Sequence, residues 1–235
     1  MLNSCHIIST FNKKNRCNLE LFSRAKFGDM DAVKEMADDV FSLMERKGAE
    51  GNYIGCCHVE NHLNSSELLS REVSKLSGIP LACIGAHTFQ TKSYVCMSRE
   101  EKDAHYSRNL FSAGRVEGKV ILVDDCCASG ITLSSWGDVF INSGARGIDS
   151  FVFIKFLNED FERLYRFCLY DLHGFEQIKR TLCDYSNPIT SQAVSFVHNL
   201  PELQKREVLM GLGRERQNEY LHLLADQFGE KLIYA

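Results

Sequence analysis

The residues best suited to chemistry follow a short apolar run in the middle of the chain. After residues 120–123 come two carboxylates, Asp124 and Asp125, then a loop of small residues and a helical pattern that starts near Thr132. Gly130 permits dihedral angles in which loop amides converge, and a helix beginning here adds the positive end of its dipole, so the turn suits a phosphate. Carboxylates accept hydrogen bonds from vicinal hydroxyls. One short segment therefore fits both ends of a ribose 5-phosphate.

A buried strand and a helix must flank this turn. Residues 119–123 are typical of a strand covered on both faces of a parallel sheet, and the apolar spacing after Thr132 predicts a helix that stops at Gly144. Further strands are expected at 52–60, 81–86 and 148–156, with a helix capped by Ser65 or Ser66 between the first two. This order predicts an α/β fold with a parallel sheet and right-handed crossovers.

The rest of the chain adds helices and one long loop. Residues 1–18 show no clear periodicity, residues 19–44 carry helical faces, and residues 88–115 are polar enough to predict a loop. From residue 158 onward the pattern is helical, with Asn187 and Pro188 expected to begin one of the helices. We therefore expect three parts: an N-terminal segment and helix at 1–50, a core at 51–157, and a helical C-terminal extension at 158–235.

The segment 120–132, VILVDDCCASGIT, resembles the phosphoribosyl pyrophosphate (PRPP) motif of type I phosphoribosyltransferases. That motif has four apolar residues, two acids, three variable residues, Ser or Thr, Gly, any residue, and Ser or Thr, and every element is met here. The resemblance implies the Rossmann-like sheet of that family, with Asp124 and Asp125 holding the ribose hydroxyls. It also implies that the 5-phosphate is wrapped by Ala128, Ser129, Gly130, Ile131 and Thr132. The alternative is a strand that happens to end in two solvated acids.

A looser resemblance points to the competence-associated branch of the family. The stretch AKFGD at 25–29 is similar to a Lys-Tyr-x-Gly-Asp region of that branch, and Gln90, Arg99, Asn109 and Phe111 resemble its loop pattern with changed spacing. The branch often carries a preceding zinc site. Cys5 and Cys17 lack the close pairing that a four-ligand site needs, so no zinc finger is expected.

The family resemblance also implies a reaction. Family members displace pyrophosphate through an oxocarbenium-like transition state, so Mg²⁺ is the expected cofactor. The 88–115 loop resembles a mobile loop that closes over PRPP, and its basic residues are Lys92, Arg99, Lys102 and Arg108. Of these, Arg99 and Lys102 are expected to act in catalysis beside Asp124 and Asp125. A solvated surface loop is the alternative.

The turn after the first expected strand departs from the family. His58, Val59 and Glu60 should contact pyrophosphate through their backbone, yet the turn lacks the usual Gly or Pro and Arg, and it carries an acid that would weaken PRPP binding. Three functions therefore stay open: transfer of a phosphoribosyl group from PRPP to a small nitrogen acceptor, a PRPP or nucleotide sensor without turnover, and an effector acting on a macromolecular partner.

The cysteines allow two interpretations. Cys56 and Cys57 end one expected strand, and Cys126 and Cys127 follow another, so four thiols could gather near the site. Adjacent strand residues point to opposite faces, which disfavours chelation by both members of a pair. Buried small apolar residues are the simpler interpretation.

Composition and charge limit the classes of protein to which the chain can belong. The chain has 235 residues, 44% of them hydrophobic, a net charge of -4 and ten cysteines. A mildly acidic chain lacks the basic field of general nucleic-acid binding, and the absence of a long apolar run and of a secretory pattern predicts a cytoplasmic protein with reduced thiols. The C-terminal helices are expected to hold more apolar surface than the sheet edge needs, favouring a second copy or a protein partner. Helices that close over the substrate cleft or pack among themselves are the alternative. The residues concerned are Leu209, Leu212, Tyr220, Leu221, Leu224 and Phe228.

Overall fold

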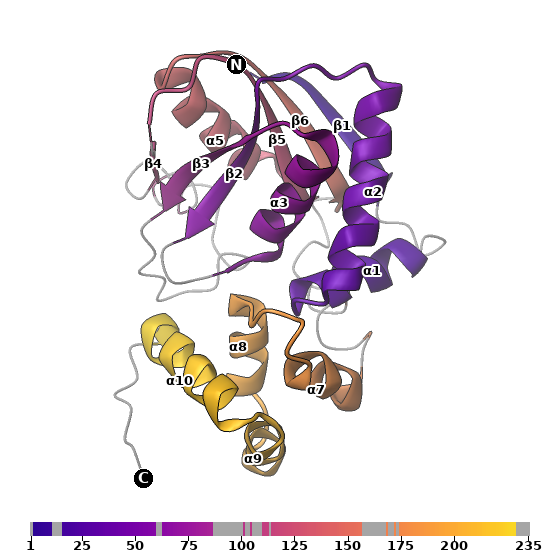
Figure 1. Ribbon diagram of the computed structural model, residues 1–235, viewed down its shortest axis with the longest axis vertical. Coiled ribbons are helices and arrows are strands. Elements are labelled where there is room, and N and C mark those ends of the chain that lie inside the picture. The colour runs from indigo at the N-terminus through magenta and orange to yellow at the C-terminus, as the bar shows by residue number, and fades with distance from the viewer. Residues whose placement is uncertain are drawn as a thin grey trace.

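The computed structural model describes residues 2–10, 16–59, 63–86, 101, 104, 110–112, 114–156, 168, 172 and 174–228. Within these ranges the chain forms a six-stranded sheet in the order β1-β6-β5-β2-β3-β4 (Figure 1). The strands are β1 (Leu2–Thr10), β2 (Tyr53–Val59), β3 (Leu81–Ala86), β4 (Leu110–Ser112), β5 (Gly118–Cys127) and β6 (Ala145–Lys155). Five strands run parallel, and β4 pairs antiparallel with β3 at one edge. The predicted parallel α/β sheet is confirmed.

Helices cover both faces of the sheet. The helices in the described ranges are α1 (Arg16–Lys26), α2 (Met30–Arg46), α3 (Ser65–Ser77), α5 (Ile131–Asn142), α7 (Phe175–Cys183), α8 (Ser191–His198), α9 (Glu202–Gly211) and α10 (Arg214–Phe228). One apolar core joins α1, α2 and α3 to the sheet, and a second joins α5 to the other face. The side chains of residues 120–123 in β5 are completely buried and alternate between the two cores, as expected of a central strand. No helix in the described ranges is long and apolar enough to cross a membrane.

Two strands fall where the sequence predicts none. Strand β1 lies in the first 18 residues, which lack periodicity, and it pairs in parallel with β6 at the sheet edge. Polar contacts support this pairing: the Ser4 hydroxyl donates to Asp149 at 2.8 Å, and the Ser150 hydroxyl donates to the Ser4 carbonyl at 3.1 Å. An edge strand held by such contacts needs no apolar alternation of its own. Strand β4 (Leu110–Ser112) lies within the predicted 88–115 loop, so the prediction of a loop is wrong for these three residues.

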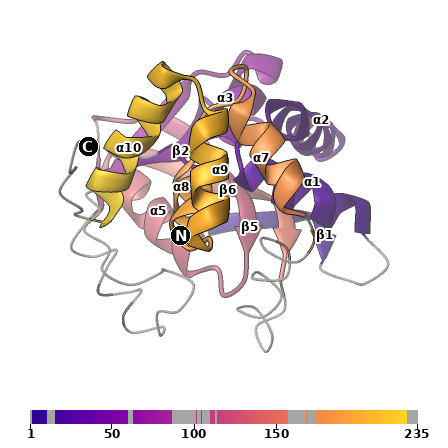
Figure 2. The same ribbon diagram turned by 90° about the horizontal axis from the view of Figure 1, so that it is seen from below.

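The C-terminal helices form a group of their own at one end of the sheet. Figure 1 shows α7 to α10 at the end toward which the β2 and β3 arrows point, and Figure 2 views the molecule from that side. A third apolar core holds these helices together. Its buried members are Phe27, Ile178, Leu182, Ile189, Ala193, Val194, Phe196, Val197, Val208, Leu212 and Tyr220.

This core uses most of the apolar surface that the sequence assigned to an interface. Leu212 and Tyr220 are buried in it, and Leu209, Leu221 and Leu224 pack against it. Of the six residues, Phe228 on α10 stays exposed, and on α9 the well-exposed large apolar side chains are those of Leu203 and Met210. The C-terminal apolar faces therefore serve mainly to pack against one another.

The C-terminal helices join the rest of the chain beside the α1–α2 turn. Gly28 has a φ of +89°, and a side-chain Cβ there would lie 2.2 Å from the Pro188 carbonyl oxygen, so only glycine allows this approach. The Thr190 hydroxyl donates to the Lys26 carbonyl at 2.7 Å. Thr190 also caps α8, accepting from the Ala193 amide at 3.2 Å.

The prediction that Asn187 and Pro188 begin this helix is therefore wrong. Asn187 is buried, and its side-chain oxygen accepts from the Met30 amide at 3.0 Å. Its carbonyl accepts from the buried Arg216 guanidinium, which also donates to the Leu182 carbonyl. Asn187 thus connects the N-terminal helices to the C-terminal group, a role that local sequence signals do not reveal.

Candidate functional site

The two predicted acids lie in the last part of β5, within the sheet. The sequence places the end of this strand at Val123, but pairing with β6 continues through Cys127, with Asp124 opposite Val152. Because β2 and β5 are parallel neighbours, their carboxyl ends meet at one edge of the sheet, where ligands bind in open α/β proteins.

Asp125 is held by residues from two different helices. Its carboxylate lies 2.7 Å from the ammonium nitrogen of Lys26, the last residue of α1, and the Ser65 hydroxyl at the start of α3 donates to it. The side chain of Asp125 is only 2% exposed, and that of Lys26 is 14% exposed. A buried carboxylate requires this kind of partner, because an unpaired charge away from water is costly.

Asp124 is also buried, but it forms no ion pair of that kind with any residue that the structure describes. It is 5% exposed, and its carboxylate accepts from the Asp125 amide at 3.0 Å. Burial, followed by repulsion from Asp125, raises the pKa of Asp124 to about 7, while the nearby Lys26 charge partly opposes this rise. These two residues are therefore not solvated surface acids.

The loop after β5 offers backbone donors beside the acids. Gly130 has a φ of +78°, which disfavours any other residue, and the space around its Cα is open. It occupies the N-cap position of α5, where it has no side chain to cap the helix. The first amides of an α-helix have no partner within the helix, so an anion could bind them. Ser129 is exposed, Ala128 and Thr132 are half-buried, and Ile131 is buried.

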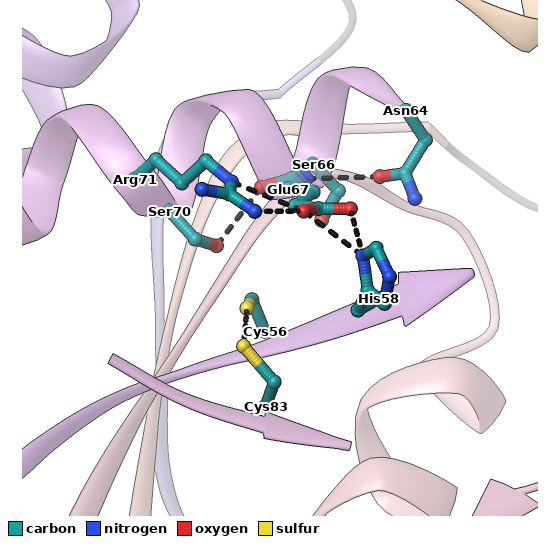
Figure 3. Close-up of polar contacts among 8 residues, drawn as sticks. All are labelled: Cys56, His58, Asn64, Ser66, Glu67, Ser70, Arg71 and Cys83. Atoms are coloured by element: carbon teal, nitrogen blue, oxygen red, sulfur yellow. Dashed lines mark hydrogen bonds and ion pairs between the residues drawn. The ribbon is translucent and has the colours of Figure 1, made fainter. Parts of the chain in front are cut away.

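A polar network lies on the α3 side of β2 (Figure 3). Glu67 is completely buried and accepts from the Arg71 guanidinium at 2.6 Å, while the ring nitrogen Nδ1 of His58 lies 3.1 Å from the same carboxylate. Asn64 caps α3 by accepting from the Glu67 amide at 2.9 Å. The expected cap at Ser65 or Ser66 is therefore wrong by one or two positions.

The predicted site residues are only partly described. His58 lies near the carboxyl end of β2 and Val59 ends that strand, whereas Glu60 lies outside the described residues. Arg99 and Lys102 also lie outside them, as do Lys92 and Arg108. The acids and the glycine loop are thus the part of the predicted site whose geometry the structure provides.

Sequence reasoning missed the partners of the acids. Lys26 belongs to the AKFGD stretch that the resemblance singled out, but no local pattern links it to Asp125, which is 99 positions away. The neighbouring ion pair of Glu67 and Arg71 was also missed, although the sequence indicates it more clearly. An acid four residues before an arginine on a helix is a recognised pair.

The sequence left a group of four thiols open, with buried small apolar residues as the simpler interpretation. Cys56 contacts Cys83 of β3, with 3.2 Å between the Sγ atoms, whereas Cys57 is buried in the core on the α5 side. In the described ranges, no three His, Cys, Asp or Glu side chains gather as metal ligands.

The fold and this edge of the sheet define a parallel α/β protein with an acid pair and a glycine turn at the carboxyl ends of its strands. No protein-family model and no curated protein sequence matches the chain. Among solved structures, it is similar to adenine phosphoribosyltransferase from Thermoanaerobacter pseudethanolicus, with 16% identity, 54% of this chain and 82% of that chain covered, and a TM-score of 0.38.

Two further solved structures show the same kind of similarity. For a hypoxanthine phosphoribosyl transferase of Trypanosoma cruzi the identity is 16%, the coverage 59% of this chain and 66% of that one, and the TM-score 0.32. For the UMP synthase of Leishmania donovani the identity is 12% and the TM-score 0.34, and the match covers 83% of this chain but only 33% of that one.

Replacing Lys26 with methionine should destabilise the protein by about 3–5 kcal/mol, because it leaves the buried Asp125 carboxylate without its counter-charge. The double variant Lys26→Met/Asp125→Asn should recover a large part of this loss, since the unpaired charge is then gone. Urea unfolding of the wild type, both single variants and the double variant measures this coupling. Strictly additive losses would contradict it.

The raised pKa of Asp124 predicts a pH-dependent stability. Between its unfolded value near 3.8 and its folded value of about 7, the native state holds a proton that the unfolded state lacks, so acidification from pH 8 to pH 5 favours folding. Asp124→Asn should therefore stabilise the protein more at pH 8 than at pH 5, by about 2–3 kcal/mol. Urea unfolding at both pH values tests this, with the exposed Asp138→Asn as the matched control. An equal effect at the two pH values would count against the buried, proton-holding carboxylate.

Proposed function

We propose that this protein binds PRPP at the carboxyl end of β5 and transfers its 5-phosphoribosyl group to a nitrogen nucleophile, with release of pyrophosphate. The observation that carries the proposal is the convergence of two buried carboxylates with the glycine turn that begins α5. Carboxylates suit the ribose hydroxyls, and backbone amides at a helix N-terminus suit the 5-phosphate.

The energetic character of Asp124 supports a functional role. A carboxylate whose pKa is raised by burial and by a neighbouring acid destabilises the fold at neutral pH. Such costs are found at functional sites, where the group is needed for something other than stability.

Magnesium is the proposed cofactor. Carboxylate oxygens are ligands that Mg²⁺ favours, and a cation beside Asp124 would offset the repulsion that raises its pKa. Asp124 would therefore hold the ion, alone or with Asp125. When bound, Mg²⁺ supplies positive charge to the phosphate oxygens of the substrate.

In this proposal Lys26 both positions the Asp125 carboxylate and competes with the ribose hydroxyls for it. It keeps Asp125 paired at 2.7 Å and fixes the carboxylate at the end of β5. The ribose hydroxyls would have to share Asp125 with this ammonium group. That competition favours a second candidate function, a sensor that binds PRPP without transferring its sugar, and pyrophosphate release distinguishes the two functions.

The proposal predicts that Asp124→Asn/Asp125→Asn abolishes PRPP binding in the presence of Mg²⁺, because both hydroxyl acceptors lose their charge. Gly130→Ala should also weaken binding, by strain at a positive φ, while both acids stay in place. Calorimetric titration measures affinity, circular dichroism checks folding, and Asp138→Asn is the control.

Pyrophosphate release across a panel of nitrogenous bases then separates transfer from binding alone. Release with at least one base supports the transferase, and saturable binding without release from any base supports the sensor. Wild-type affinity in the folded double-acid variant would overturn the site assignment.

A further inference from the structure

Two thiols on neighbouring strands lie directly opposite each other. Cys56 of β2 and Cys83 of β3 are register partners, and their Sγ atoms are 3.2 Å apart (Figure 3). Neighbouring strands are about 4.8 Å apart, which lies within the roughly 4.4–6.8 Å between Cα atoms that a disulfide spans. The two sulfurs can therefore be joined with little backbone movement.

The two thiols differ in access. Cys56 is completely buried, whereas Cys83 is partly exposed near the sheet edge. A reagent from solution therefore reaches Cys83 first. This is the arrangement of an attacking thiol with a buried resolving thiol behind it.

The contact between the two thiols favours a thiolate at Cys83. A hydrogen bond with Cys56 is the main cause that lowers the pKa of Cys83 to about 7, and the nearby Arg71 and His58 add to this effect. Burial and the Glu67 carboxylate oppose it. The same hydrogen bond, together with burial, raises the pKa of Cys56. Cys83 is thus the nucleophile, because thiolates rather than thiols attack disulfides.

We propose that Cys56 and Cys83 form a reversible thiol–disulfide site, with a low-molecular-weight disulfide such as oxidised glutathione as the oxidant. The Cys83 thiolate attacks one glutathione sulfur, the sulfur–sulfur bond of glutathione breaks, and one glutathione thiolate leaves. Cys56 then loses its proton to that thiolate or to water and attacks the Cys83 sulfur, which expels the second glutathione. Two protein thiols are oxidised to one disulfide, and one glutathione disulfide is reduced to two thiols.

This modification site is independent of the proposed PRPP function. Cys56 precedes His58 by two residues, so the new bond would join β2 and β3 just before the network of His58, Glu67 and Arg71. The chain also supplies comparison thiols. Cys57 is the sequence neighbour of Cys56 but is buried in the α5-side core, and burial raises its pKa to about 12. Cys5 is exposed, and its register partner is Ser150.

The test uses the reduced full-length protein, oxidised glutathione, and alkylation with iodoacetamide before peptide mass spectrometry. The expected product is a peptide pair linked through Cys56 and Cys83 within one molecule, which excess reduced glutathione releases. Cys56→Ser should stop at a glutathione adduct on Cys83, because the resolving thiol is gone. Cys5→Ser, the control, should still form the linked peptide.

The rate of alkylation provides a second readout. In the Cys56→Ser variant and in the wild type, the pH dependence of Cys83 alkylation reports its thiolate fraction, and Arg71→Gln should shift the wild-type midpoint from near pH 7 to a higher pH. The proposal is overturned if folded wild-type protein keeps both thiols free in oxidised glutathione, if the linked peptides come from two molecules, or if Cys83 stays glutathionylated beside an intact Cys56.

Discussion

The ion pair between Lys26 and Asp125 constrains the end of the sheet where the candidate site lies. Lys26 ends α1, Asp125 is near the end of β5, and Ser65, which also donates to this carboxylate, begins α3. A carboxylate that is 2% exposed is tolerated only with such partners. The placement of α1 and α3 over β5 is therefore tied to one charge.

That constraint extends in both directions along the chain. Just after Lys26, Gly28 makes close contact with the Pro188 carbonyl, and Thr190 donates to the Lys26 carbonyl itself, so the C-terminal helices are anchored at the same point. On the other side, the first turn of α3 carries the Glu67 carboxylate to His58 and Arg71. The acid pair thus lies where three segments that are distant in sequence meet.

Asp124 gives this meeting point its chemical character. Its neighbour Asp125 has a counter-charge, whereas burial and repulsion raise the pKa of Asp124 to about 7. A fold selected for stability alone would replace such a residue with an uncharged one. We interpret its presence, beside a glycine turn that opens toward a helix N-terminus, as the mark of a binding site for a hydroxylated, phosphorylated ligand.

Local patterns were sufficient to predict strands β2, β3, β5 and β6 and the position of the acid pair after an apolar strand. The apolar run at 120–123 is continuous because β5 is covered on both faces, and the turn that follows it combines acids, glycine and hydroxyls within a few positions. Strand β1 escaped prediction because an edge strand relies on backbone pairing and on contacts such as Ser4 with Asp149. Such contacts are not visible in local sequence.

Partners that are distant in sequence escaped prediction for the same reason. Nothing near Lys26 indicates Asp125, and nothing near Cys56 indicates Cys83, since the register of two strands decides which residues face each other. Asn64 was missed as the cap of α3 because Ser65 and Ser66 are equally good capping types. Their hydroxyls instead face β5, where Ser65 donates to Asp125 and Ser66 to the Val123 carbonyl.

Hydrogen–deuterium exchange of the full chain, with and without PRPP and Mg²⁺, tests the central claim most directly. If the acid pair and the glycine turn bind the ribose and its phosphate, the ligand should slow amide exchange in peptides that cover residues 124–134. Peptides from α9, in the C-terminal group, should exchange at the same rate with and without ligand. Saturable PRPP binding that protects other peptides and leaves residues 124–134 unchanged would contradict the account.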